Sequence, residues 1–102
     1  MILINTTFHV HNSIINDFID WANNIYINKA LTSEYLSSPL LSKILAETDP
    51  EGTSFALQLK ATDIDKAQQW HDIEAETIKN DAFKKWGEKI LHFTTYMEII
   101  EK

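Results

Sequence analysis

Residues 40–61, LLSKILAETDPEGTSFALQLKA, contain two strand-like segments on either side of one turn. In the turn, Asp49-Pro50-Glu51-Gly52, the proline fixes its φ angle, the aspartate can bond to the backbone ahead of it, and the glycine tolerates a left-handed conformation. After the turn, apolar residues alternate with small or polar ones, with the period of two that is typical of a strand. The stretch therefore predicts a β-hairpin with strands over about 40–48 and about 53–60.

One further strand and one helix are predicted on each side of this hairpin. Apolar residues recur at every second position in the strands and at every third or fourth position in the helices. Asp63 and Gly87 are suited to the two ends of the second helix, because aspartate caps helix N-termini and glycine caps their C-termini. The predicted elements are a strand over residues 2–10, a helix from Asn12 or Ser13 to Tyr26, a connecting segment over 28–38, a helix over 63–87 and a strand over 90–100.

The order of these elements, βαββαβ, nearly dictates the topology. Because crossover connections are right-handed, the expected solution is an α+β fold of the split-βαβ, or ferredoxin-like, kind. Its four-stranded antiparallel sheet has the order 4-1-3-2, and both helices cover one face. A chain of 102 residues with 44% hydrophobic content is long enough for one such core and too short for two. Residues 1–102 are therefore expected to form a single domain.

Two helices can cover only one face of such a sheet, and apolar residues remain on the other. If that face stayed exposed, the protein would lose about 1.5–3 kcal/mol of stabilisation for each large apolar side chain that could be buried. A second copy of the chain is the expected cover, which predicts a homodimer. The set assigned to the helix side is Ile4, Phe8, Ile44, Phe55, Leu57, Phe93 and Met97, and the opposite set is Leu3, Leu41, Leu45, Ala56 and Tyr96.

Polar side chains from three strands are assigned to the same uncovered face. Between two subunits they must bond to one another, to water or to a ligand, because an unpaired buried amide costs about 1–3 kcal/mol. Two interpretations stay open: a network that specifies the dimer geometry, or a cavity for a small apolar or aromatic molecule. The polar set is Asn5, Thr7, His9, Gln58, Lys60, His92, Thr94 and Tyr96, and the candidate binding residues are Asn5, Gln58, His92, Thr94, Tyr96 and the flanking Trp70.

The pattern indicates neither a catalytic residue nor a set of metal ligands. His71 lies in the apolar stripe of the second predicted helix and is interpreted as a core residue with one hydrogen bond. The carboxylates at 72–76 lie on a solvated helix and lack the paired geometry of an acid–base site. His9 and His11 alternate on one strand, but a third metal ligand is lacking. Neither a metal nor a cofactor is expected.

The composition excludes several classes of protein. The chain has no cysteine and a formal charge of -6, which excludes disulfides and thiolate catalysis and favours a cytoplasmic location. Its nine Lys and Arg residues are scattered, which argues against nucleic acid as a partner. Residues 1–4 are apolar but lack a basic region before them, so neither a signal peptide nor a membrane span is expected.

Several short patterns resemble those of a known family. They are Trp21, Tyr26-Ile27, Leu36, Ser38, the strand SFALQ at 54–58, Trp70, Glu74-Ala75, Trp86-Gly87, and Phe93-Thr94-Thr95 with Glu98. Together they span nearly the whole chain and resemble an uncharacterised bacterial family, a domain of unknown function placed among the dimeric α+β barrels. Its members usually carry His and Pro at the positions of Tyr26 and Asn28, and Arg at that of Thr94. The resemblance implies the fold and a dimer, but no activity.

Two classes of function remain. The first is a binding or regulatory module with a cavity between its subunits. The second is an enzyme similar in architecture to the cofactor-independent monooxygenases, the isomerases or the haem-degrading proteins, an analogy of fold alone. The haem-degrading relatives combine an Asn, a Trp and a His, and here Asn5 and Trp70 match the first two while Asn80 stands where the His is expected.

Overall fold

The computed structural model describes residues 1–45 and 49–101. The strands are β1 (Ile2–His11), β2 (Leu36–Lys43), β3 (Gly52–Ala61) and β4 (Ile90–Glu98). The first helical stretch consists of the 3-10 turn η1 (Asn12–Ile14), α1 (Ile15–Trp21), the π-helical turn η2 (Ala22–Tyr26) and α2 (Ile27–Leu31). The second consists of α3 (Ile64–Trp70), the π-helical turn η3 (His71–Ala75), α4 (Glu76–Trp86) and the 3-10 turn η4 (Gly87–Lys89). Within these ranges, no helix is long and apolar enough to cross a membrane.

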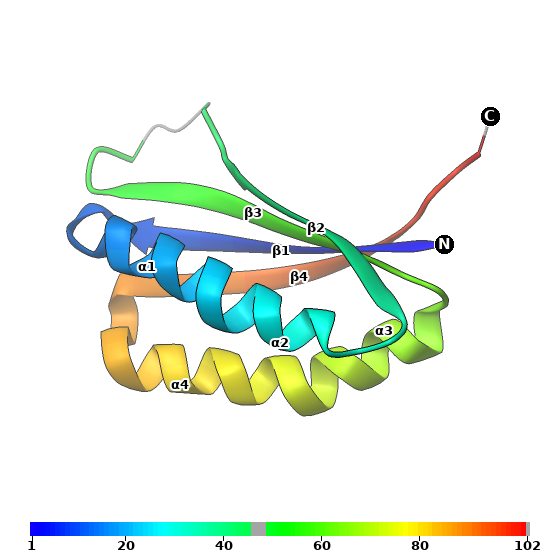
Figure 1. Ribbon diagram of the computed structural model, residues 1–102. Helices are drawn as coiled ribbons and strands as arrows, with labels where there is room; N and C mark the ends of the chain where they lie inside the picture. Colours follow the sequence, from blue (N-terminus) through cyan, green and yellow to red (C-terminus); the bar gives the residue numbers. More distant parts are fainter. Residues whose placement is uncertain (46–48, 102) are drawn as a thin grey trace.

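The four strands form one antiparallel sheet in the order β2-β3-β1-β4, and both helical stretches lie on one face of it (Figure 1). Read from the opposite edge, this is the order 4-1-3-2. The predicted ferredoxin-like fold is therefore confirmed. We call the sheet surface away from the helices the open face.

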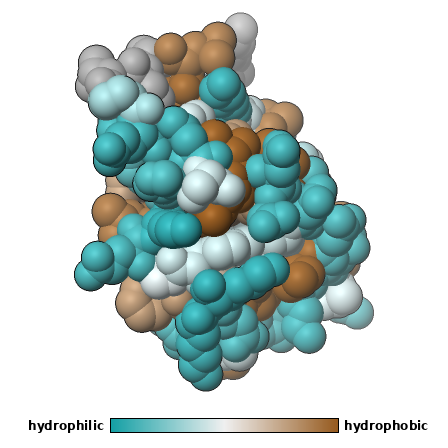
Figure 2. All heavy atoms as spheres, turned by 90° about the vertical axis from the view of Figure 1, so that its left-hand side faces the viewer, coloured by the Kyte–Doolittle hydropathy of each residue, from teal (hydrophilic) through white to brown (hydrophobic). Residues whose placement is uncertain are grey.

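The core lies between the sheet and the helices. Phe8, in the central strand β1, is fully buried, and its ring centroid lies 5.2 Å from that of Phe18 and 5.8 Å from that of Trp21. Such tilted and edge-on arrangements are the favourable ones for aromatic pairs. Hydrophilic side chains cover most of the end of the molecule near the β2–β3 connection, with hydrophobic residues visible in the middle (Figure 2).

The caps of the second helical stretch agree with the sequence. The Asp63 carboxylate accepts a hydrogen bond from the Lys66 backbone N–H at 2.8 Å, as an N-cap residue does. Gly87 follows α4 with a φ of 58°, a value that favours glycine. The first stretch differs by one or two residues, because the His11 ring accepts the hydrogen bond from the Ser13 N–H in place of an Asn12 or Ser13 cap.

Strand β2 begins and ends earlier than predicted. It includes Pro39, and its pairing with β3 shifts between Ser37 and Leu40, where Ser38 has a φ of 55°. Proline lacks the N–H that a central strand needs but is tolerated at the edge of a sheet and at bulges. The segment over 28–38 is therefore not a plain connection, since it includes the end of α2 and the start of β2. The predicted extension of β2 over 46–48 lies outside the described residues.

In the turn before β3, Asp49 has the predicted role, but the reason for the glycine differs from the predicted one. The Asp49 carboxylate accepts the Glu51 N–H at 2.9 Å, as expected. Gly52 is not in the left-handed region; instead, a Cβ atom there would overlap the ring of His9. That ring lies 2.8 Å from both Ser54 Oγ and the Asp49 carboxylate, so His9 joins the turn to the sheet.

The side chains of β4 lie on the opposite faces from those predicted. Thr94 pairs with Thr6 of β1, and Tyr96 pairs with Ile4. Residues directly opposite in neighbouring strands share a face, and Thr6 and Ile4 are buried beneath the helices. His92, Thr94 and Tyr96 therefore lie on the helix side, which corrects their assignment to the open face.

The open face carries Phe93 and Met97 instead. Their exposed fractions are 62% and 38%. In β2, Leu40 is on this face, whereas Leu41 pairs with Leu57 on the helix side. Both alternating sets of β4 contain large apolar side chains, so the period of two does not decide which of them faces the helices.

Candidate functional site

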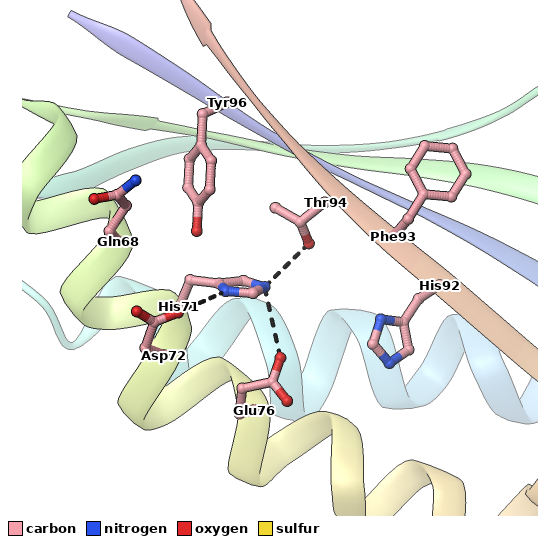
Figure 3. A pocket seen from close by; sticks show the side chains of 8 residues that line it. All are labelled: Gln68, His71, Asp72, Glu76, His92, Phe93, Thr94 and Tyr96. Atoms are coloured by element: carbon pink, nitrogen blue, oxygen red, sulfur yellow. Dashed lines mark hydrogen bonds and ion pairs between the residues drawn. The ribbon is translucent and has the colours of Figure 1, made fainter.

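A groove of about 480 Å³ opens between the second helical stretch and the edge strand β4 (Figure 3). One wall comes from α3, η3 and the start of α4, and the other from β4. The close-up shows the side chains of His71 and Thr94 meeting across the groove, with the Tyr96 hydroxyl above them and Glu76 below. The lining residues are Gln68, His71, Asp72, Glu76, His92, Phe93, Thr94 and Tyr96.

Lys79 lies behind this wall and is the most unusual group of the site. Only 2% of the residue is exposed. Its Nζ atom donates to His71 Nε2 at 2.9 Å and to Thr94 Oγ1 at 3.0 Å. Among residues 1–45 and 49–101, no carboxylate lies within ion-pair distance of Nζ. Burial lowers the pKa of Lys79 to about 8, against an opposing effect of Glu76.

The ammonium of Lys79 determines which ring nitrogen of His71 accepts a hydrogen bond. An ammonium has only donors, so His71 Nε2 must accept and the ring proton must lie on Nδ1. That nitrogen points to the Asp72 carboxylate at 3.4 Å. The Glu76 carboxylate lies 3.8 Å from Nε2. In this arrangement the His71 ring lies between a buried ammonium and two carboxylates at the groove rim.

The polar contacts continue from Thr94 into the core. Thr94 Oγ1 lies 2.9 Å from Thr6 Oγ1 and 3.1 Å from His71 Nε2. Thr6 also lies beside the hydroxyl of Tyr26; burial raises the pKa of Tyr26, and the contact with Thr6 opposes this to a smaller extent. We call these five residues, Lys79, His71, Thr94, Thr6 and Tyr26, the Lys79 cluster.

Both helical stretches contain a π-helical turn where they meet this cluster. Tyr26 is the last residue of η2, and His71 is the first residue of η3. A π-helical turn inserts an extra residue and changes the direction of the side chains that follow, and such turns are frequent at functional sites. Here the two irregular turns bring one polar side chain each to the same place.

The groove also perturbs the two ionisable rings of β4. The pKa of His92 is lowered, first by burial and then by the charge of Lys79. The pKa of Tyr96 is raised by burial and by the nearby carboxylates of Asp72 and Glu76. Both effects keep these side chains neutral at pH 7, so the rings present polar but uncharged edges to the groove.

The structure divides the six predicted binding residues into separate groups. His92, Thr94 and Tyr96 line the groove on the helix side. Asn5 and Gln58 are direct partners in the β1–β3 ladder, as neighbours on the open face. Trp70 is 1% exposed and packs against Tyr26 in the core. The predicted single cavity is therefore not formed by these residues within one subunit.

Sequence reasoning missed Lys79, Thr6, Tyr26 and Glu76, and it interpreted His71 as a core residue. The available signal was weak: Lys79 directly follows Ile78 in the apolar stripe of the second helix. A lysine beside such a stripe usually extends its charged end into water, and only the position of β4 shows that this one does not.

The described residues contain no group of three His, Asp or Glu side chains that could hold a metal ion. The Asn5 and Trp70 side chains that matched the haem-degrading pattern lie on opposite faces of the sheet. They cannot contact one ligand within a single subunit.

The family model for the domain of unknown function DUF4286 matches residues 1–100. The chain belongs to this family. The resemblance seen in the sequence is thereby confirmed, and the family brings no assigned activity. A search of curated proteins finds no match.

Solved structures similar to this DUF4286 domain share its fold at low sequence identity. A proposed antibiotic biosynthesis monooxygenase from Deinococcus radiodurans has a TM-score of 0.72 and 13% identity, with 100% of this chain and 95% of that one covered. A dimeric ferredoxin-like protein from an uncultured marine organism has a TM-score of 0.69 and 12% identity over 99% and 96%. An ethyl tert-butyl ether d (ethd) family protein from Bacillus halodurans has a TM-score of 0.65 and 13% identity over 97% and 100%. At these identities the likeness concerns the fold alone.

Proposed function

We propose that this domain is a homodimeric binding module that holds a small molecule in the groove between the second helical stretch and β4. The observation that carries the proposal is the buried Lys79 ammonium without an acidic partner in the described chain. An uncompensated buried charge destabilises a protein. Titratable groups perturbed in this way beside a cleft are candidates for a functional site.

The binding site of this proposal differs from the inter-subunit cavity expected from the sequence. The polar groups of β4 face the helices, so the groove and the open face lie on opposite sides of the sheet. Phe93 is common to both, since it is on the open face and also lines the outer edge of the groove. A ligand in the groove would thus lie next to the proposed dimer interface without being inside it.

Three features support a dimer through the open face. Large apolar side chains there are exposed, including Leu40 at 56% and Leu91 at 60%. The side-chain oxygen Oδ1 of Asn5 is buried and has no hydrogen-bond partner among the described residues, a situation that a partner subunit or a trapped water would relieve. A structural neighbour at 12% identity is described as dimeric.

The dimer is tested by placing charges on the open face. Light scattering coupled to gel filtration should give twice the 11.8 kDa chain mass for the wild type. The double change Leu40→Glu with Leu91→Glu should give monomers, because it buries two carboxylates in an apolar interface. Phe83→Glu is the matched control, since Phe83 is equally exposed, at 57%, but lies on α4. A monomeric wild type at micromolar concentration would contradict the dimer.

The groove is tested by filling it. Gln68 lines the groove, whereas the neighbouring Gln69 is exposed and does not. A thermal-shift screen of small acids, amines and neutral aromatics should identify a molecule that stabilises the wild type. Its effect should disappear in Gln68→Trp and persist in Gln69→Trp. Stabilisation that is equal in both variants would place the binding site elsewhere.

A second candidate function is enzymatic. His71 Nε2 and Lys79 Nζ lie 2.9 Å apart at the groove wall, and such a pair can pass a proton to or from a bound molecule. Two of the structural neighbours are proposed antibiotic biosynthesis monooxygenases. An oxygen electrode distinguishes the candidates: oxygen uptake when the molecule found in the screen is added favours a monooxygenase, and no uptake favours a binding module.

A further inference from the structure

We infer that the groove takes a small organic anion, an aromatic carboxylate in chemical class, whose charged oxygen supplies the counter-charge that Lys79 does not find among the described residues. The inference rests on the proposed binding function and specifies its ligand. It depends on the position of Lys79, on the hydrogen-bond capacity of Thr94 and on the side chains that flank the groove.

The charge of Lys79 is directed at the groove through its two partners. His71 and Thr94 accept its hydrogen bonds, and both line the groove. Neither partner is charged in this arrangement, so the positive charge is not neutralised. Coulomb interactions act over a longer range in a desolvated site than in water. An anionic oxygen at the His71 and Thr94 wall would therefore be attracted by an ammonium one layer behind it.

Thr94 has a donor available for such an oxygen. A hydroxyl has one donor and two acceptor sites. In the arrangement in which Thr6 donates to Thr94, the second acceptor site of Thr94 is filled by Lys79. Because His71 Nε2 already accepts from Lys79, the hydroxyl hydrogen of Thr94 is free to turn into the groove. An anion bound there would receive a hydrogen bond strengthened by the ammonium behind it.

The carboxylates of the groove lie toward solvent. The side chains of Asp72 and Glu76 are 74% and 46% exposed, so water and salt screen their charges. Lys79 is screened far less because it is buried. Among the described residues, the other ionisable groups of the groove and of the Lys79 cluster are His71, His92, Tyr96 and Tyr26, and none of them carries a negative charge at neutral pH. The net attraction at the inner wall is therefore for an anion.

The rings of His92 and Tyr96 suggest an aromatic body for the ligand. Both lie on the helix side of β4 and line the groove on either side of Thr94 (Figure 3). A planar molecule whose acidic group meets Thr94 would have these rings beside it, and aromatic groups pack favourably in this manner.

The test compares acids with their uncharged amides. Benzoate, phenylacetate and indole-3-acetate are titrated against the protein beside benzamide, phenylacetamide and indole-3-acetamide, with thermal shift and ligand-observed NMR as the measurements. The acids should bind the wild type at least about tenfold more tightly than the amides, which is the size expected of one charge-assisted hydrogen bond. Lys79→Met should remove this preference. Lys84→Met, an exposed position on the same helix, should keep it.

Proton uptake on ligand binding is a second measurement. It would not occur if Lys79 had only a structural role. An anion near Lys79 favours its ammonium form, so binding at pH 8 should take up protons. Titration calorimetry of benzoate in two buffers of different ionisation enthalpy should detect this uptake, and Lys79→Met should not show it. A further variant, Glu76→Gln, should strengthen acid binding by removing a rim charge.

The outcomes separate the ligand class from the site. If the amides bind as tightly as the acids and Lys79→Met changes neither, the anion inference is wrong while the groove remains a binding site. If none of these compounds binds, and if the thermal-shift screen finds no molecule that stabilises the wild type but not Gln68→Trp, both proposals fail. Acid preference that is equal in wild type and Lys79→Met would also overturn the inference, because the charge would then be recognised elsewhere.

Discussion

Lys79→Met is expected to stabilise the folded protein at pH 7, raising the free energy of unfolding by about 2 kcal/mol. The pKa of Lys79 is about 8 in the folded chain against 10.5 for an ordinary lysine, a difference that disfavours the buried ammonium by about 3 kcal/mol. Methionine has a similar length and no charge. Part of the gain is offset because His71 and Thr94 lose a donor, which costs about 1 kcal/mol.

The stabilisation should depend on pH with a definite sign. Between pH 8 and 10.5 the unfolded chain keeps the Lys79 proton while the folded chain has released it. The contribution of Lys79 to the free energy of unfolding of the wild type therefore rises with pH in this range. Below pH 8 both states are protonated and the cost of burial is fully present. The advantage of Lys79→Met over the wild type should therefore shrink from pH 7 to pH 10.

Urea unfolding at these two pH values, at one fixed protein concentration, checks this expectation. Lys84→Met is the matched control and should change stability by less than about 0.5 kcal/mol at either pH. A Lys79→Met variant less stable than the wild type at pH 7 would show that the Lys79 cluster is a net structural gain. Its structural role would then account for the buried lysine, and Lys79 would no longer mark a binding site.

Leu57→Ala should lower the free energy of unfolding by about 2–5 kcal/mol. Leu57 is 1% exposed in the central strand β3 and pairs with Thr6 of β1 and Leu41 of β2. The surrounding strands cannot close fully around the lost atoms, so a cavity remains.

Leu31→Ala is the matched control, because it removes the same atoms from a side chain that is 48% exposed at the end of α2. Its cost should be well under that of Leu57→Ala. Urea midpoints in the reverse order would contradict the assignment of β3 side chains to the core.

Much of the fold follows from local signals in the sequence. Asp63 and Gly87 mark the ends of the second helical stretch because the hydrogen bonds of a helix cap involve residues only a few positions apart. The alternation in β1 and β3 gives the buried sets correctly, since one face of each strand is clearly more apolar. With the order of elements and the right-handed crossover, these signals suffice for the 4-1-3-2 sheet.

The bounds of β2 could not be found in this way. Pro39 and the shift between Ser37 and Leu40 interrupt both the alternation and the ladder, so the local pattern resembles a connection. Only the pairing with β3 makes the segment a strand. Gly52 of the turn is a similar case. A side chain at this position would overlap the ring of His9, which is distant in the sequence.

The candidate site depends on contacts between distant segments. The residue types in β4 permit either face to be buried, and the register that pairs Thr94 with Thr6 decides that the polar set of His92, Thr94 and Tyr96 faces the helices. In this register β4 covers Lys79. Thr94, which lies 15 positions further along the chain, then accepts a hydrogen bond from Lys79. The chain order and local periodicity were enough for the architecture, because they act over a few residues. The burial of one lysine required the tertiary structure, because desolvation depends on every segment packed around the charge.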